Sequence, residues 1–254
     1  MRRSSLLLVA ALSACGGWTG STGAPVLSPV RSAADVVTAM RARYADTWYT
    51  TLRFRQKVIQ TRADGTLAPE QVWLEHARVP GALRIDRAAA YDGNATLFAA
   101  DSTYVLRNGE VVRRAPGGNI LLVLGFDVYR QPVARTLARL GAEGLDLGVV
   151  RTDTWQGRPA FVIGATAGDT TSAQFWVDAE RLVFVRLIQS TPQGRSEVRF
   201  DDYRPLAGGW ISPTVVFLRA GREVMREEYF DIEANPRLPD GLLDPSRWHT
   251  VRPR

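Results

Sequence analysis

The stretch LRFRQKV (residues 52–58) alternates strictly between two kinds of side chain. In an extended chain Leu52 and Phe54 fall on one face together with Gln56 and Val58, while the three intervening residues are all basic. A period of two with one apolar face is typical of a half-buried β-strand. This stretch therefore predicts a sheet that has one face packed on a core and one face in solvent.

Similar segments follow along most of the chain, separated by turn residues. Asp64-Gly65 and Asn108-Gly109 are dipeptides that readily adopt the positive φ of hairpin turns. About a dozen consecutive strands with short turns predict one large antiparallel sheet, which at that size tends to curl. The further expected strands are 71–76, 82–86, 95–100, 102–106, 111–114, 149–155, 160–165, 172–177, 182–190, 196–203, 211–218 and 224–234.

Two regions break this rhythm and predict helices. Ser32–Tyr49 has an N-cap candidate in Ser32, Asp35 three residues later and apolar residues at helical spacing. In the middle of the chain, residues 120–126 are almost wholly apolar and residues 133–140 have helical spacing, so two short helices joined near Tyr129 are expected. The fold class predicted is α+β: an incomplete antiparallel β-barrel covered by the N-terminal helix and a mid-chain helical lid.

The N-terminus has the features of an export signal. Arg2 and Arg3 precede a short apolar run, which ends in LSAC (residues 12–15) with Cys15 as the only cysteine of the 254 residues. LSAC resembles the bacterial lipobox, in which the cysteine is acylated, and Gly16 after it favours the outer membrane. The alternative is an ordinary signal peptide. We expect a signal peptide at 1–14, a lipidated cysteine and tether at 15–31 and one domain at 32–254.

Composition argues against several classes of function. The pI near 10.0 suggests nucleic acid, but Lys57 is the only lysine, the arginines are dispersed and no nucleic-acid-binding motif occurs. His76 and His249 have no partner at metal-ligand spacing, and no nucleophile-elbow, P-loop or zinc-protease motif is present. We expect no cofactor, no metal, no nucleic-acid partner and no enzyme activity. A catalytic centre built from scattered carboxylates stays open as an alternative.

A succession of short motifs resembles the lipoprotein carriers LolA and LolB of outer-membrane lipoprotein sorting. FRQKV (54–58) after an amphipathic helix resembles the F-x-Q-K-V strand of LolA, and Trp73 and RVP (78–80) continue the correspondence. The segments at 155–160, 175–182, 200–204 and 209–213 resemble others of these sorting proteins, in the same order from about Ala34 to Asp244. The resemblance implies a half-barrel with a helical lid that binds acyl chains without catalysis.

The resemblance also implies which residues form the site. With the period of two, it gives a lipid-binding cavity of Leu52, Phe54, Trp73, Leu83, Phe175 and Phe217. It gives a lid of Leu121, Leu122, Leu124 and Phe126, with Arg78 in the place of an arginine that tethers the lid. For each apolar residue the alternative is ordinary core packing.

The leading hypothesis is an outer-membrane lipoprotein on the periplasmic face, held by Cys15, that binds lipid or lipoprotein acyl chains in sorting or transfer. The anchor separates it from the soluble carrier LolA. The alternative is a sensor or scaffold that binds envelope proteins, for example through a convex face that includes Arg53, Arg55 and Lys57.

Overall fold

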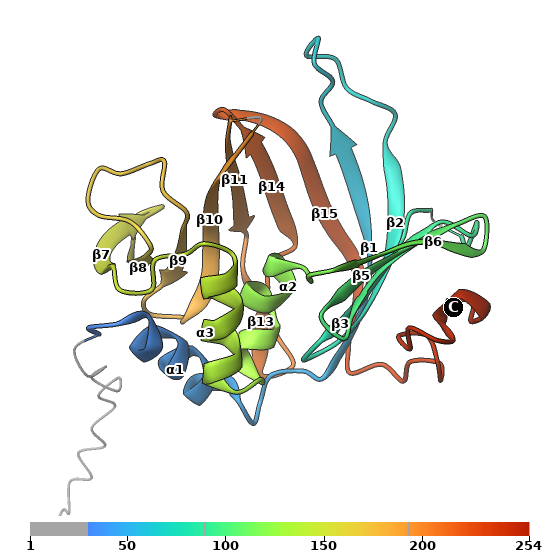
Figure 1. The fold of residues 1–254 in the computed structure, drawn as a ribbon, viewed down its shortest axis with the longest axis horizontal. Helices are drawn as coiled ribbons and strands as arrows, with labels where there is room; N and C mark the ends of the chain where they lie inside the picture. The colour runs from blue at the N-terminus through green and yellow to red at the C-terminus, as the bar shows by residue number, and fades with distance from the viewer. Residues whose placement is uncertain (1–29, 89, 193, 254) are drawn as a thin grey trace, which may run out of the picture.

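The computed structural model describes residues 30–88, 90–192 and 194–253 of the chain (Figure 1). The predicted signal peptide, the predicted acylation site Cys15 and nearly all of the predicted tether lie outside the described residues.

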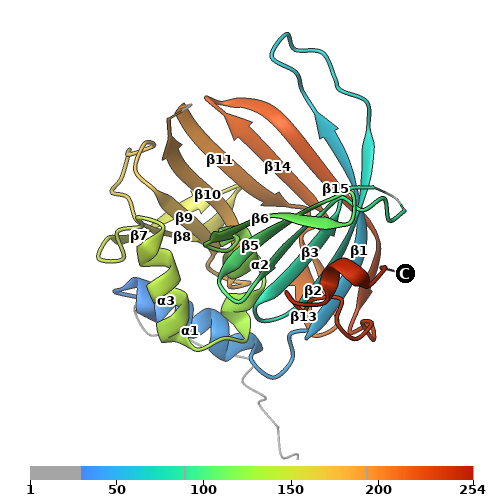
Figure 2. The same ribbon diagram turned by 45° about the vertical axis from the view of Figure 1, so that its right-hand side comes forward.

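One antiparallel sheet of 13 strands dominates the fold, in the order β6-β5-β4-β3-β2-β1-β15-β14-β11-β10-β9-β8-β7. The sheet curls strongly but does not close, because its edge strands β6 and β7 do not pair with each other (Figures 1 and 2). The prediction of an incomplete antiparallel barrel is confirmed. The strands are β1 (Thr51–Gln60), β2 (Gln71–Arg78), β3 (Ala82–Asp86), β4 (Ala95–Ala99), β5 (Ser102–Arg107), β6 (Glu110–Pro116), β7 (Val150–Trp155), β8 (Arg158–Ile163), β9 (Gln174–Asp178), β10 (Val183–Thr191), β11 (Gly194–Asp201), β14 (Thr214–Arg219) and β15 (Arg222–Ala234).

Strand β1 lies near the middle of the sheet, between β2 and β15, and it shows the predicted alternation. Its apolar face is buried on the concave side of the sheet, and its basic face is convex. Each basic residue has an acidic neighbour: Arg53–Glu233 at 2.6 Å, Arg55–Asp231 at 3.8 Å and Lys57–Glu70 at 3.8 Å. The convex face suggested as a partner surface therefore has its positive charge compensated.

The helices gather on the concave side of the sheet (Figure 2). They are α1 (Ala33–Tyr44), α2 (Ile120–Gly125), the 3-10 turn η1 (Asp127–Tyr129) and α3 (Val133–Ala142). Helix α1 begins as predicted, because the Ser32 hydroxyl accepts the Asp35 N–H at 3.2 Å and the Asp35 carboxylate accepts the Ser32 N–H at 3.0 Å. It ends at Tyr44, five residues before the predicted end, and the chain then turns toward β1.

The expected strand 211–218 is wrong as a single element. Ile211 ends β13 (Gly209–Ile211), which pairs with β12 (Arg204–Leu206) in a separate two-stranded sheet, and β14 begins only at Thr214. Pro213 has no N–H to donate to a ladder, so it separates the two strands. The Ser212 hydroxyl donates to the Asp201 carbonyl oxygen at 2.7 Å and fixes the break.

The C-terminal segment (residues 235–253) covers part of the convex face (Figure 2). It contains the 3-10 turn η2 (Trp248–Thr250) and buries Leu242, Leu243 and Trp248 against the apolar convex side chains of β3, β4 and β5. Nothing in the sequence pattern predicted this cover. In the ranges that the structure describes, no helix has the length and apolar character needed to cross a membrane.

Candidate lipid-binding cavity

An apolar cavity of about 210 Å³ lies between the concave face of the sheet and α2. Its walls come from β1, β2, β3, β11, β14 and β15, and its cover is the side of α2 that carries Leu121, Leu122 and Phe126. Every second side chain of each strand points inward. The inward side chains of neighbouring strands lie beside one another across the ladder and form a mainly apolar surface. The curvature of the sheet leaves a space between these side chains and the helix.

Helix α2 owes its position to a side-chain cap at one end and a close packing contact at the other. The Asn119 side chain accepts the Leu121 N–H at 2.8 Å, which starts the helix directly over the cavity. At its end, Gly125 lies so close to Phe200 that a Cβ on Gly125 would be 2.9 Å from a ring carbon. We call α2 and η1 together the lid.

The structure brings most of the predicted cavity and lid residues together. Leu52, Phe54, Leu83 and Phe217 line the cavity, and from the lid so do Leu121, Leu122 and Phe126. Leu124 is fully buried but packs into the main core and does not line the cavity. Whether these residues touch a lipid stays a prediction.

Two predicted cavity residues lie elsewhere. Trp73 shares the concave face but lies beyond the cavity, with Arg87 5.7 Å above its ring and a hydrogen bond to Gln71 at 2.9 Å. Phe175 on β9 is fully buried in the main core and does not line the cavity. Both point inward as the alternation predicts, but position along and across the sheet decides which inward residues meet the space.

Polar contacts other than the predicted one hold the lid to the rest of the fold. Arg78 is exposed at the end of β2, and no hydrogen bond joins its side chain to the lid within the described ranges. Instead the Gly81 N–H, in the β2–β3 turn, donates to the Asp127 carboxylate at 3.0 Å. The Tyr129 hydroxyl accepts the Phe184 N–H at 3.3 Å. Directly after the lid, Arg130 donates to the Trp48 carbonyl oxygen at 2.7 Å, and Arg41 donates to the Gln131 carbonyl oxygen at 3.0 Å.

Asp127 is the acidic group of this connection and is only 4% exposed. Burial raises the pKa of its carboxyl to about 7, although the Gly81 N–H and the charges of Arg135 and Arg139 act in the opposite direction. The lid is therefore held by a buried acceptor whose removal leaves the Gly81 N–H without a partner.

Replacement of Asp127 by alanine is expected to loosen the lid. The lost acceptor leaves a part-buried N–H unsatisfied, which costs about 1–3 kcal/mol. Amide hydrogen exchange should become faster in residues 120–129 while exchange in β8–β10 stays unchanged. Asp127→Asn keeps an acceptor oxygen and serves as the control, and equal lid exchange in Asp127→Ala and the unaltered chain would contradict the assignment.

A polar cluster lies in the wall of the cavity, and the sequence analysis missed it. Glu75 on β2 and Glu227 on β15 both line the cavity, and the Tyr229 hydroxyl donates to Glu227 at 3.3 Å. Burial raises the pKa of Glu75 well above its usual range, and the neighbouring Glu227 raises it further. Burial also raises the pKa of Glu227 to about 7, with Tyr229 and the nearby Gln56 amide acting against it. The alternation along β2 could have identified Glu75, because it follows the inward Trp73 by two residues and therefore lies on the same face.

Other concave regions of the surface are less suited to an apolar ligand. An open cleft of about 600 Å³ lies between the C-terminal segment and the convex side of the sheet, and its lining includes Arg53, Arg237, Asp240 and Arg252. It is larger than the cavity, but its lining is charged. The described part of the chain contains no group of three or more His, Cys, Asp or Glu side chains arranged to hold a metal ion.

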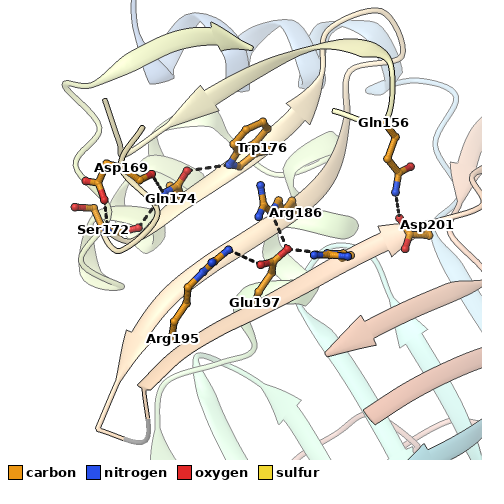
Figure 3. Close-up of polar contacts among 10 residues, drawn as sticks. Gln156, Asp169, Ser172, Gln174, Trp176, Arg186, Arg195, Glu197 and Asp201 are labelled. Carbon is orange, nitrogen blue, oxygen red and sulfur yellow. Dashed lines mark hydrogen bonds and ion pairs between the residues drawn. The ribbon is translucent and has the colours of Figure 1, made fainter. Parts of the chain in front are cut away.

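The convex face of β9–β11 carries a second polar cluster, shown in Figure 3. The Glu197 carboxylate accepts hydrogen bonds from Arg186 at 2.9 Å, Arg195 at 2.5 Å and Arg199 at 2.7 Å. Burial favours its protonated form, but the bonds from Arg186 and Arg199 outweigh burial and leave its pKa below the usual range. Arg186 also lies 4.5 Å above the Trp155 ring. The contact between Arg186 and Glu197 ties β10 to β11.

Comparison with known proteins gives a likeness in structure only. No family model matches the sequence, and no curated protein matches it. A DUF1329 family protein from Desulfovibrio piger has a TM-score of 0.56 at 14% identity, covering 84% of this chain and 96% of its own. A putative outer membrane lipoprotein-sorting protein domain from Vibrio parahaemolyticus has a TM-score of 0.55 at 13% identity, covering 85% of this chain and 97% of its own.

A LolA superfamily protein from Nitrosomonas europaea has a TM-score of 0.48 at 14% identity, covering 83% of this chain and 98% of its own. At these sequence identities the comparisons show a similar fold and nothing about function. On the first two likenesses, the chain shares the fold of the DUF1329 family protein and of the putative lipoprotein-sorting domain, and the resemblance predicted from its motifs is confirmed for the fold.

Proposed function

We propose that the protein is an envelope lipoprotein that binds the acyl chain of a lipid or lipoprotein in the cavity and takes part in its sorting or transfer. In this proposal Cys15 is acylated and holds the protein on the periplasmic face of the outer membrane. The observation that carries the proposal is the apolar cavity itself, enclosed by the concave face of the sheet and a short apolar lid. The function is binding and not catalysis.

The size of the cavity means that the lid has to move if a long acyl chain is to bind. Hydrocarbon gains about 0.8 kcal/mol for each methylene that leaves water, so a lined apolar space binds an acyl chain without specific polar contacts. Ligand pockets usually have volumes of about 300–1,000 Å³, and this cavity is smaller at about 210 Å³. A long chain therefore enters only if the lid moves outward, and the small number of lid hydrogen bonds permits such movement.

Replacement of Ala77 by phenylalanine is the test, because the Ala77 side chain lines the cavity and a ring there fills the space. All variants carry Cys15→Ser so that they need no detergent. The ligand is the neutral glycerol ester of a ten-carbon acyl chain, measured by titration calorimetry. We expect binding by the Cys15→Ser chain and at least a tenfold loss with Ala77→Phe.

The matched control is Val112→Phe, because Val112 is an exposed side chain on the edge strand β6. It should bind the ester as the parent does. Overpacking at Ala77 costs about 1–3 kcal/mol, so thermal unfolding is measured for every variant, and Ile85→Phe provides a second filled cavity. Unchanged binding in both folded cavity variants would disprove the proposal, as would absence of binding by the parent.

A further inference from the structure

The cavity holds two carboxylates that no basic residue neutralises. Glu75 and Glu227 are 5% and 9% exposed, and within the described ranges neither forms an ion pair with an arginine or a lysine. Three of the other buried acids in the described ranges have cationic partners: Arg84 pairs with Asp86 at 2.8 Å, Arg158 pairs with Asp178 at 2.6 Å, and three arginines surround Glu197. A fourth, Asp127, accepts the Gly81 N–H. A buried charge without a partner is costly, so the pair calls for an explanation.

Gln56 lies between the two carboxylates and is itself unsatisfied. On β1 it is directly opposite Tyr229 of β15 and Trp73 of β2, and the next inward residues on those strands are Glu227 and Glu75. Gln56 is fully buried, and neither of its amide atoms has a hydrogen-bond partner in the part of the chain that the structure describes. Its amide is near enough to Glu227 to influence it, but not in hydrogen-bond geometry.

The polar cluster lies toward the end of the cavity that is away from the lid contact. Leu52, Phe54 and Gln56 follow one another on the inward face of β1. The lid is tied to Gly81, which directly precedes β3, and this end of β3 lies level with Leu52 across β2. A ligand chain that enters beneath the lid beside Leu52 therefore places its other end beside Gln56 and the carboxylates. The cavity has an apolar end and an acidic end.

We propose that this acidic end binds the protonated primary amine of a single-chain amphiphile whose hydrocarbon chain fills the cavity, and that it excludes chains that end in a carboxylate. A primary ammonium carries three N–H donors. They match acceptors at this end: one oxygen each from Glu75 and Glu227, which line the cavity, and the unpartnered side-chain carbonyl of Gln56, which is buried between them on β1. A carboxylate head would add a third acid beside Glu75 and Glu227, and the repulsion of like charges would oppose its binding. The inference rests on the proposed function, since it names the ligand class of the same cavity.

Binding of an amine should strengthen as pH rises through 7. Burial raises the pKa of Glu227 to about 7, so Glu227 loses its proton in this region and the acidic end gains attraction for a cation. Burial and the neighbouring Glu227 raise the pKa of Glu75 well above its usual range. The other titratable groups on this side are Tyr229, whose raised pKa keeps it neutral, and Arg87, which lies over Trp73. The lid, β11 and β14 contribute only uncharged lining side chains.

Three ligands of equal chain length separate the head from the tail: decylammonium, decanoate and the neutral glycerol ester of decanoate. Titration calorimetry at pH 8 on the Cys15→Ser chain should show at least tenfold tighter binding of decylammonium than of decanoate. Between pH 6 and pH 8 the affinity for decylammonium should rise severalfold, while that for the neutral ester stays constant. This pH series needs no further substitution.

The variants Glu75→Gln, Glu227→Gln and their combination keep the shape of the side chains and remove the charge. The combination should bring the affinities for decylammonium and decanoate within threefold of each other and leave the neutral ester within threefold of the parent. The matched control is Glu228→Gln, which is adjacent in sequence and lies opposite Lys57 on the convex face. It should keep the preference for the amine.

The outcomes distinguish this inference from the proposed function. Binding of the neutral ester with no preference for the amine, or a preference that survives the double substitution, would overturn the inference and leave the proposed function intact. Failure of all three ligands to bind would overturn both.

Discussion

Replacement of Arg84 by methionine is expected to lower the free energy of unfolding by about 3–5 kcal/mol and to release the C-terminal segment from the sheet. Arg84 lies on the convex side of β3 and is fully buried. Its guanidinium donates to both oxygens of the Asp86 carboxylate, at 2.8 and 2.9 Å. Methionine fills a similar volume but leaves the Asp86 charge buried without a partner.

The same guanidinium also holds the C-terminal segment in place. It donates to the carbonyl oxygens of Trp248 at 2.8 Å and Val251 at 2.9 Å, and it lies 5.4 Å above the Trp248 ring. These hydrogen bonds hold the C-terminal segment against β3, β4 and β5. Because one side chain satisfies both the acid and the segment, its loss affects strand and segment together.

Chemical denaturation measures the stability change, and limited proteolysis followed by mass spectrometry locates the released residues. Cleavage should appear within residues 235–253 of Arg84→Met before any cleavage in the sheet. Arg55→Met is the matched control, because Arg55 is exposed on the same convex face and its pair with Asp231 is long, at 3.8 Å. It should cost no more than about 1 kcal/mol. A loss of under 1 kcal/mol in Arg84→Met would contradict the role given to Arg84.

The alternation of LRFRQKV was enough to predict the sheet, because burial of one strand face is a local pattern. It placed Leu52 and Phe54 inward, and both line the cavity. The C-terminal segment could not be predicted in this way. Its contacts with Arg84 join residues more than 150 positions apart, and a run with no periodic pattern gives no sign of the surface that it covers.

The same limit explains which site residues were found. The alternation along a strand identifies the residues that point inward. Trp73 and Phe175 point inward and still lie outside the cavity, because the curvature of the sheet and the order of its strands decide where a cavity remains. Glu75 and Glu227 were overlooked since inward positions are expected to be apolar. Arg78 was predicted to tether the lid because of the family resemblance, but it is exposed. The observed contact is made by Asp127 in the lid itself, whose carboxylate accepts the Gly81 N–H.

Replacement of Trp48 by alanine is expected to cost about 3–5 kcal/mol, the usual price of deleting a large buried aromatic ring. Trp48 is 2% exposed and lies where α1, β13 and the lid meet. Its ring stacks on Tyr129 of the lid at a centroid distance of 3.7 Å and meets the edge of Tyr44 at 5.2 Å. Its loss therefore removes the ring that packs against both Tyr44 and Tyr129, and leaves the direct contact between those two rings, at 5.5 Å, to join α1 to the lid.

A double-mutant cycle with Gly209 shows whether this cost comes from packing. A Cβ at Gly209 would lie 2.4 Å from a carbon of the Trp48 ring, so Gly209→Ala alone forces the ring out of place and is expected to cost about 1–3 kcal/mol. In the Trp48→Ala background the ring is absent and the added methyl group fits into the vacated space. Gly209→Ala should then cost less than about 0.5 kcal/mol or stabilise the protein, which gives a coupling energy of at least about 0.5 kcal/mol. Denaturation of the four chains measures the cycle, and additive costs would mean that Trp48 does not pack against Gly209 as described.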